Sequence, residues 1–306
     1  MKTTKPGLVL ILSFITAFSF SQYQSQSGFY ETGIVNEGLS MESSILKGKV
    51  NFTVYLPPNY EKSTQKYPVL YLLHGHSDNE ITWIQRGEIK GTLDRAIADR
   101  VVSPMIVIMP DAKVTWYIND YTGKTRYEDM IFDEFIPFID KNYRTRTERA
   151  YRAVAGLSMG GYGSLVWSLH HPEVIGSCAA YSSGIFADED LRNLDTERYN
   201  NYYKGLYGSG AQGNRITEHW KKNSVIELMS TLPKEQIGMV KFYIDCGDDD
   251  SWSKGNSLLH LVMIDRNIYH EYRVKDGPHN WTYWRTNIIE GLIFISRQFA
   301  QAPSVP

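Results

Sequence analysis

Short apolar runs alternate along this chain with longer segments in which apolar residues recur every three or four positions. The short runs are typical of β-strands, and runs such as residues 104–109 are apolar at every position, so both faces of those strands must be covered. A parallel sheet buried between helices satisfies this requirement. Strands are expected at residues 52–56, 67–73, 104–109, 150–155, 175–180, 240–245 and 269–274.

Segments with helical spacing lie between these strands, at residues 91–98, 127–143, 159–171 and 286–299. Pro137 interrupts the second of them, because proline cannot donate a backbone hydrogen bond. The alternation predicts an α/β fold, with a doubly wound, mostly parallel sheet and helices on both faces. Residues 184–233, rich in Asn, Tyr and Gly, depart from this rhythm, and we interpret them as an insertion that shapes a substrate cleft.

Composition narrows the classes of partner. No repeat or linker divides residues 22–306, so we expect one domain there. A formal net charge of −2 argues against nucleic acid, because binding to a phosphate backbone needs a basic excess. Cys178 and Cys246 are too few for a disulfide framework, and we expect buried free thiols. No motif requires a cofactor.

The first 21 residues have the composition of a secretory signal peptide. Lys2 and Lys5 precede a mostly apolar stretch at residues 8–20, and small residues follow it. About 13 apolar residues are too few to span a bilayer, which needs roughly 20. We therefore expect a secreted or periplasmic protein with no membrane anchor after residues 1–21 are removed.

Residues 156–160 read Gly-Leu-Ser-Met-Gly and match the G-x-S-x-G motif. The motif is informative only where a strand arrives, turns sharply at the serine and leaves as a helix. Both neighbouring elements are expected here, and Gly161 and Gly163 extend the run of small residues. Ser158 is therefore the candidate nucleophile, although a tightly packed glycine turn without chemistry has the same pattern.

A serine hydroxyl needs a base to remove its proton. Of the eight histidines, His279 follows the last expected strand in a loop at the carboxyl edge of the sheet, where sites of open α/β folds form. The orienting acid should lie between serine and histidine in the chain. The residues themselves leave four choices open, namely Asp245, Asp248, Asp249 and Asp250.

Acyl transfer also needs two N–H donors for the oxygen that becomes negative. Met159, directly after the serine, is expected to supply one, and His76, in the turn after an earlier strand, the other. His74 and His76 alone lack the further ligands of a metal site, so none is expected. Among many aromatic residues, we expect Trp116, Tyr117 and Trp281 to line a substrate cleft because each adjoins one of these loops.

Together these motifs resemble the esterase D branch of the α/β-hydrolases, which includes the feruloyl and acetylxylan esterases of carbohydrate esterase family 1. The resemblance extends over residues 52–298 and rests on Leu-Leu-His-Gly at 72–75, Ile-Met-Pro-Asp at 108–111 with Trp116-Tyr117, Gly-Leu-Ser-Met-Gly-Gly at 156–161, Cys-Gly-Asp-Asp-Asp at 246–250 and Gly-Pro-His-Asn-Trp at 277–281. It implies an α/β-hydrolase fold, Ser158 as nucleophile, His279 as base and Asp250, the last residue of the Cys-Gly-x-x-Asp pattern, as acid. The additional acids at 248 and 249 and the long segment 184–233 depart from the family pattern.

The sequence thus predicts a secreted serine carboxylesterase acting on feruloyl or acetyl esters of plant polysaccharide or on related small esters. Two related chemistries compete, a thioesterase of the S-formylglutathione hydrolase type and an acyltransferase. A polysaccharide-binding module without catalysis is a third alternative. The sequence does not indicate an oligomeric state.

Overall fold

The computed structural model describes Met1 and residues 30–302. Apart from Met1, the predicted signal peptide at residues 1–21 lies outside the described residues, so it stays a prediction. Residues 31–302 form one compact unit. Within residues 30–302, no helix is both long enough and apolar enough to cross a membrane.

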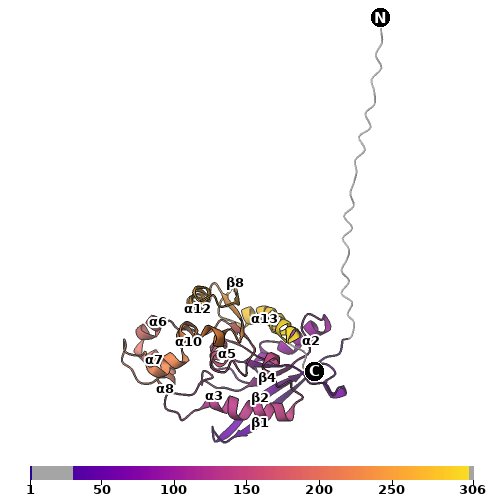
Figure 1. Ribbon diagram of the computed structural model, residues 1–306, viewed down its shortest axis with the longest axis horizontal. Coiled ribbons are helices and arrows are strands. Elements are labelled where there is room, and N and C mark those ends of the chain that lie inside the picture. The colour runs from indigo at the N-terminus through magenta and orange to yellow at the C-terminus, as the bar shows by residue number, and fades with distance from the viewer. Residues whose placement is uncertain (2–29, 303–306) are drawn as a thin grey trace. The chain divides into compact units, whose positions relative to one another are not determined.

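An eight-stranded sheet runs through this unit in the order β1-β2-β4-β3-β5-β6-β7-β8 (Figure 1). The strands are β1 (Ile34–Ser43), β2 (Gly48–Leu56), β3 (Val69–Leu73), β4 (Ile106–Pro110), β5 (Arg152–Leu157), β6 (Ser177–Tyr181), β7 (Lys241–Gly247) and β8 (His270–Lys275). The pairs β1–β2 and β2–β4 are antiparallel, and the five pairs from β4 to β8 are parallel. The expected mostly parallel α/β sheet is confirmed.

Helices pack on both faces of the sheet because successive strand residues point to opposite sides. Tyr71 of β3 belongs to one apolar cluster, whereas its neighbours Leu70 and Leu72 belong to another. The first cluster includes Leu165 of α5, and the second includes Leu292 of α13. The helices outside the insertion are α1 (Thr82–Gln85), α2 (Ile89–Ala98), α3 (Tyr127–Met130), α4 (Ile136–Asn142), α5 (Met159–His170), α12 (Ser253–Asp265) and α13 (Trp281–Gln301).

The expected helix at residues 127–143 forms in three parts. The α3 helix continues into the π-helical turn η2 (Ile131–Phe135), and α4 begins directly after it. Pro137 occupies the first turn of α4. A widened turn before the proline accommodates its ring and its missing N–H, so the helical path is not broken there.

The chain between β6 and β7 contains the expected insertion, built from short helices seen in orange at the edge of Figure 1. They are α6 (Asp188–Asn193), α7 (Thr196–Tyr202), α8 (Lys204–Tyr207), α9 (Glu218–Asn223), α10 (Val225–Thr231) and α11 (Lys234–Ile237). Tyr203, Tyr207 and Trp220 are buried and extend the apolar cluster on the α5 side of the sheet. Aromatic packing therefore holds much of this segment against the core.

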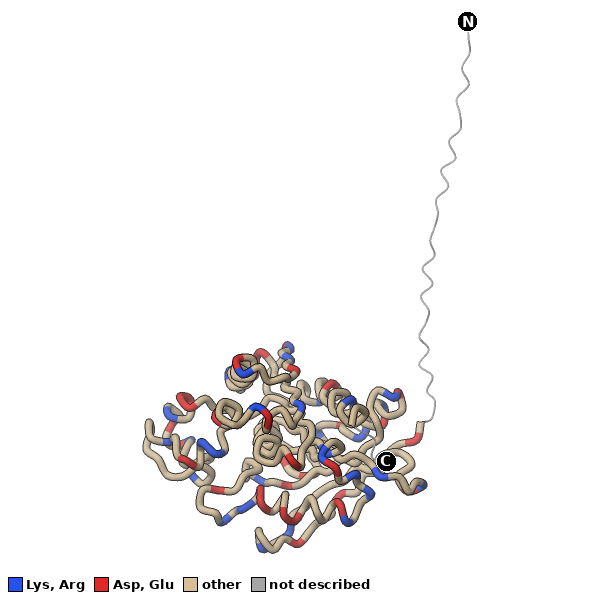
Figure 2. Tube along the Cα trace, in the orientation of Figure 1, with Lys and Arg blue, Asp and Glu red and all other residues tan. Residues whose placement is uncertain are grey.

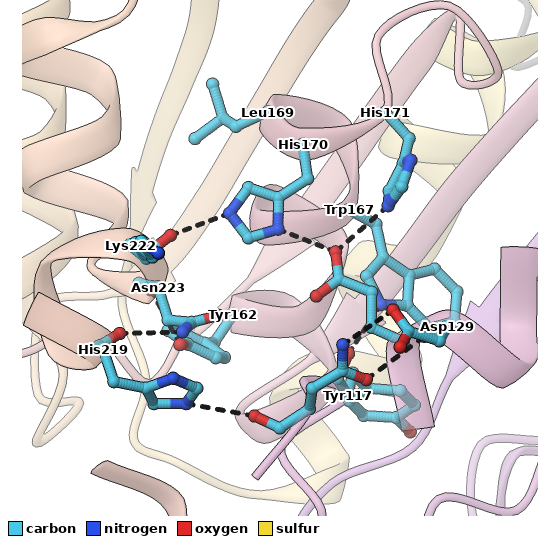
Figure 3. A network of polar contacts seen from close by, with 12 residues as sticks. Tyr117, Asp129, Tyr162, Trp167, Leu169, His170, His171, His219, Lys222 and Asn223 are labelled. Atoms are coloured by element: carbon cyan, nitrogen blue, oxygen red, sulfur yellow. Dashed lines mark hydrogen bonds and ion pairs between the residues drawn. The ribbon is translucent and has the colours of Figure 1, made fainter. Parts of the chain in front are cut away.

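A polar network also holds the insertion against the core of the protein (Figure 3). The buried carboxylate of Glu128 lies 2.7 Å from His170 Nδ1 and 3.2 Å from His171 Nε2. The other ring nitrogen of His170 lies 2.8 Å from the carbonyl oxygen of Lys222, in the insertion. Burial alone would raise the pKa of Glu128, but the hydrogen bonds from the two histidines lower it to about 2. Burial would likewise lower the pKa of His170, and its bond to Glu128 raises it instead.

Candidate active site

Ser158 stands where β5 ends and α5 begins, and its backbone is strained. Its φ of 56° and ψ of −116° lie in a region that side chains other than glycine rarely adopt. The turn is held in place because Ser158 N–H donates to Tyr181 O at 2.9 Å, while Ser158 O accepts from Tyr162 N–H at 3.0 Å. This is the strand–turn–helix geometry that presents a serine hydroxyl above the edge of a sheet.

The glycines of the motif are needed because the turn packs against neighbouring backbone. A Cβ added at Gly160 would lie 2.5 Å from Leu73 O and 2.6 Å from His74 O. One added at Gly156 would lie 2.5 Å from Gly160 O. Neither site admits a side chain without backbone movement, so the small residues fix how closely the turn approaches the end of β3.

The structure brings Ser158, His279 and Asp250 into one hydrogen-bonded series. His279 Nε2 lies 3.0 Å from Ser158 Oγ, and His279 Nδ1 lies 2.8 Å from Asp250 Oδ2 and 3.0 Å from Oδ1. A carboxylate can only accept, so Nδ1 carries the proton and Nε2 is left free to accept the serine hydroxyl. The Asp250 side chain is fully buried, and that of His279 is 27% exposed.

The other candidate acids have different contacts. Asp245 is buried and accepts hydrogen bonds from Tyr283 Oη at 2.7 Å and Tyr243 Oη at 3.0 Å, and burial raises the pKa of its carboxyl group. Asp248 and Asp249 are exposed. Asp248 accepts the N–H of Gly277 at 3.1 Å. Of the four aspartates left open by the residues alone, Asp250 is the one that contacts His279.

Two neighbours fix the position of the imidazole. Asn280, the next residue, caps α13 by accepting the N–H of Tyr283 at 3.0 Å, so His279 is held at the entry to that helix. Trp284, one turn into α13, lies edge-on to His279, with 4.7 Å between ring centroids. Its indole N–H donates to Ser182 Oγ at 2.9 Å.

The residues predicted to supply N–H donors lie in the turns that follow β3 and β5, and His76 lines both clefts together with Ser158. Met159 is the first residue of α5, and a helix leaves its first N–H groups without intrahelical partners. His76 follows the end of β3 in a turn closed by Asp78 N–H donating to Gly75 O at 3.2 Å. His74 holds this turn from beneath, because its Nδ1 bonds Gly75 O at 2.8 Å and its Nε2 accepts Ala112 N–H at 2.9 Å.

Ser158 lies between two clefts. The first, of about 560 Å³, is lined by Gly75, His76, Asp78, Arg86, Leu157, Ser158, His279, Asn280, Trp281, Thr282 and Trp284. Its charged side chains are Asp78 and Arg86, which lie 3.8 Å apart, and burial raises the pKa of Asp78. The predicted cleft residue Trp281 lies in this wall, with its ring against Trp83.

The second cleft, of about 270 Å³, opens on the insertion side of the serine. It is lined by His76, Trp116, Ser158, Arg198, Tyr202, Tyr203 and Trp252. The ring of Trp116 packs on Tyr203, and that of Tyr202 on His76. The wall is thus mainly aromatic, with the guanidinium group of Arg198 as its charged group.

The prediction that Tyr117 lines the cleft is wrong. Its side chain is fully buried, its ring packs edge-on against Trp167, and its hydroxyl donates to His74 O at 3.0 Å. Trp116 and Tyr117 have φ values of 55° and 64°, so the backbone turns at both positions. The turn directs Trp116 to the second cleft while Tyr117 supports the loop of His74 from below.

The chain matches a known protein family over most of its length. The model of a family described as "Putative esterase" matches residues 43–295. The chain belongs to this esterase family. It is 36% identical over 153 residues to an endo-1,4-beta-xylanase/feruloyl esterase of Xylanibacter ruminicola, a match covering 48% of this chain and 21% of that protein. It is 25% identical to an acetyl esterase of Caldicellulosiruptor saccharolyticus, over 85% of this chain and 97% of that one.

A solved ferulic acid esterase has the same fold, with a TM-score of 0.74 and 29% identity over 89% of this chain and all of that one. The resemblance to feruloyl and acetylxylan esterases stated from the motifs is therefore confirmed, as is the α/β-hydrolase fold. Membership of the family agrees with the enzyme class expected from the sequence, a carboxylic ester hydrolase. The chain spans about a fifth of the length of the xylanase/feruloyl esterase that it matches.

Sequence reasoning missed several residues that line the two clefts. In the first cleft they are Asp78, Arg86, Asn280, Thr282 and Trp284, and in the second Arg198, Tyr202, Tyr203 and Trp252. A signal existed for some of them, since Trp252 follows Asp250 by two residues and Trp284 lies one helical turn after Asn280. The insertion was expected to shape the cleft, but nothing in its sequence distinguished Arg198 from its other charged residues.

Proposed function

We propose that this chain is a secreted serine carboxylesterase that hydrolyses feruloyl or acetyl esters of plant polysaccharide, or related small esters. The observation that carries the proposal is the hydrogen-bonded series from Ser158 through His279 to the buried Asp250. Family membership and similarity to feruloyl and acetyl esterases support the substrate class.

The mechanism follows from the protons in this series. His279 Nε2 accepts the proton of Ser158 as Oγ bonds to the ester carbonyl carbon, and Asp250 stabilises the resulting imidazolium. The carbonyl oxygen becomes negative and accepts hydrogen bonds from the N–H groups of Met159 and His76, each worth about 3 to 4 kcal/mol. The bond to the alcohol oxygen then breaks as that oxygen takes the proton from Nε2. Water releases the acyl group by the same sequence of proton transfers.

The two clefts divide the substrate between them. The leaving alcohol must approach His279, because that residue returns the proton, and His279 lines the first cleft and not the second. The alcohol portion, a sugar in the proposed substrate, therefore occupies the first cleft, where Trp281 offers its ring. The acyl group occupies the second cleft, whose aromatic wall suits a cinnamoyl-type ring better than the acyl group of a formyl thioester.

The test compares Ser158→Ala with a matched serine of the same helix. Ser168 is buried in α5, where its hydroxyl bonds Ser164 O at 2.8 Å. Ser158→Ala should abolish hydrolysis of p-nitrophenyl acetate and methyl ferulate and labelling by a fluorophosphonate, whereas Ser168→Ala should retain all three. Parental activity in Ser158→Ala would refute the proposal. A wild-type protein that is neither labelled nor active would instead support a binding module.

The remaining alternatives differ in the products formed. Hydrolysis of methyl ferulate should yield free ferulate whether or not a sugar acceptor is added, whereas an acyltransferase would form a sugar ester. Faster turnover of S-formylglutathione than of any oxygen ester would favour the thioesterase. Export is tested separately, by N-terminal sequencing of the protein recovered outside the cytoplasm, which should begin after residue 21.

A further inference from the structure

A second basic site lies apart from the two clefts. A cavity of about 370 Å³ opens between the hairpin that joins β1 to β2 and the loop that follows β4. Its wall includes four lysines, Lys47, Lys49, Lys113 and Lys124. We name it the lysine cavity. Elsewhere basic and acidic residues are interspersed along the chain trace (Figure 2), so this grouping stands out in a protein of net negative charge.

Most of this positive charge is uncompensated. Among the described residues, Lys47, Lys113 and Lys124 form no ion pair, and Lys49 is 4.0 Å from the exposed carboxylate of Glu42. Asp111 adds one negative charge to the wall, where its carboxylate accepts the backbone N–H of Lys113 at 2.8 Å and the charge of Lys113 helps to lower its pKa. The cavity therefore holds more ammonium groups than carboxylates, and Lys47 and Lys124 form no ion pair within the described chain.

The lysine cavity opens at the same edge of the sheet as the active site. Its residues Asp111 and Ala112 directly follow β4, and Ser158 directly follows β5. Strand β3 is the one strand between them in the sheet, so the two strand ends are about 10 Å apart. A chain molecule of a few units lying along this edge reaches both the cavity and the first cleft.

We propose that the lysine cavity binds the carboxylates of an acidic polysaccharide. Lysine recognises an anion as a point charge on a flexible stem, which suits carboxylates repeated along a polymer. A single exposed ion pair contributes little, so one small anion gains little here, whereas a polymer that engages several lysines at once binds by avidity. The hydroxyl group of Thr125, also in the wall, can bond a sugar hydroxyl, whereas that of Thr115 already accepts the N–H of Tyr117 at 3.3 Å.

The experiment measures binding rather than catalysis, so it is independent of the proposed esterase activity. Full-length protein is titrated with de-esterified glucuronoxylan, with the same polymer after its carboxyl groups are reduced to alcohols, and with inorganic phosphate. The acidic polymer should bind, the reduced polymer should not, and binding should weaken as NaCl is raised from about 20 mM to about 500 mM. Phosphate should displace the polymer only at ionic strengths at which NaCl also does.

The variant Lys47→Gln/Lys113→Gln/Lys124→Gln should bind the acidic polymer at least about tenfold more weakly. The matched control, Lys66→Gln/Lys141→Gln/Lys234→Gln, removes the same charge from exposed lysines away from the cavity and should bind as the parent does. Both variants should melt as the parent does and hydrolyse p-nitrophenyl acetate at its rate. Equal loss in the two triple variants, equal binding of the reduced polymer, or saturable binding of phosphate alone would overturn the proposal.

Discussion

The ring of Trp284 stands edge-on to the imidazole of His279, with an angle of 87° between their planes. The indole is itself anchored, since its N–H donates to Ser182 Oγ. Asp250 holds the same imidazole at Nδ1, so the ring is located by one polar and one aromatic contact. In the proposed mechanism Trp284 is thus a positioning residue that acts through His279.

Replacing this contact should slow the reaction more than it weakens substrate binding. In Trp284→Leu the imidazole loses one of its two supports, and a displacement of about 1 Å can reduce the rate about 100-fold. We expect kcat for p-nitrophenyl acetate to fall about 10- to 100-fold with little change in KM, whereas Trp284→Phe should retain most of kcat. A rise in KM at constant kcat would instead indicate that Trp284 contacts substrate.

Two neighbouring aspartates should respond differently to the same amide substitution. Asp250→Asn removes the acceptor that fixes the tautomer of His279, and kcat should fall about 10⁴-fold without unfolding. Asp245→Asn weakens hydrogen bonds from Tyr283 and Tyr243, so it should lower the midpoint of urea denaturation while kcat stays within about tenfold. Kinetics and denaturation of both variants check this, and equal losses of kcat would contradict the proposed role of Asp250.

The polar network of Glu128, His170 and His171 should make the free energy of unfolding fall both at acidic and at alkaline pH. The pKa of Glu128 is lowered from 4.5 to about 2, so its contribution is present above pH 4.5 and lost as the pH falls toward 2. The pKa of His170 is raised above 6.5, so its contribution is present below pH 6.5 and lost as the pH rises through the raised value. The network therefore stabilises most between these limits.

Melting temperatures measured from about pH 3 to about pH 9 test this relationship. His170→Gln should flatten the decline on the alkaline side relative to the parent. Glu128→Gln should lose about 1 to 2 kcal/mol near neutrality, because it leaves the partly exposed His170 without its carboxylate partner. A parental pH profile in His170→Gln would show that other groups cause the decline.

Alanine should be tolerated at Gly91 in α2 but not at Gly160 in α5. Gly160→Ala places a Cβ against two backbone oxygens at the end of β3, so we expect loss of folding or of more than about 3 kcal/mol. Gly91→Ala in α2 meets nothing within 4 Å and should be neutral or stabilising by up to about 1 kcal/mol. Urea denaturation of the two variants measures the difference, and a stable Gly160→Ala protein would show that the turn can move.

The cysteines should be unreactive until the protein unfolds. Both are free and buried, as expected from the sequence, and burial raises the pKa of Cys178 to about 12. Burial also raises the pKa of Cys246. A thiol reagent should react slowly with the native protein and titrate both thiols in concentrated guanidinium chloride. Fewer than two equivalents under those conditions would indicate oxidation of the thiols.

Strands β3 to β7 were predictable because they are covered on both faces and so read as largely apolar runs. Strand β1 was not, because it pairs along one side and carries a register shift between Asn36 and Leu39 that breaks the alternation of buried positions. The helices of the insertion are too short to display a helical period; α8, for example, has four residues. Their positions depend on contacts with the core rather than on local pattern.

The site was predictable to the extent that local motifs define it. Ser158 and His279 each follow a strand whose end could be located in the sequence, and the structure brings them together. Asp250 could be chosen only from the family pattern. Asp248, Asp249 and Asp250 are identical neighbours, and the sequence does not show which of them is buried. Tyr117 was misassigned because two successive residues with positive φ redirect the side chains, and neither is a glycine that would signal the turn.

The second cleft draws part of its wall, namely Arg198, Tyr202 and Tyr203, from the insertion, which takes no part in the proposed proton transfers. Arg198 and Tyr202 belong to α7, between β6 and β7, whereas Ser158 and His279 are fixed to the sheet and to α13. If the second cleft holds the acyl group as proposed, substitutions in α7 can change which acyl groups fit while the residues of the proton transfers stay the same. Engineering a different selectivity should begin in the same segment.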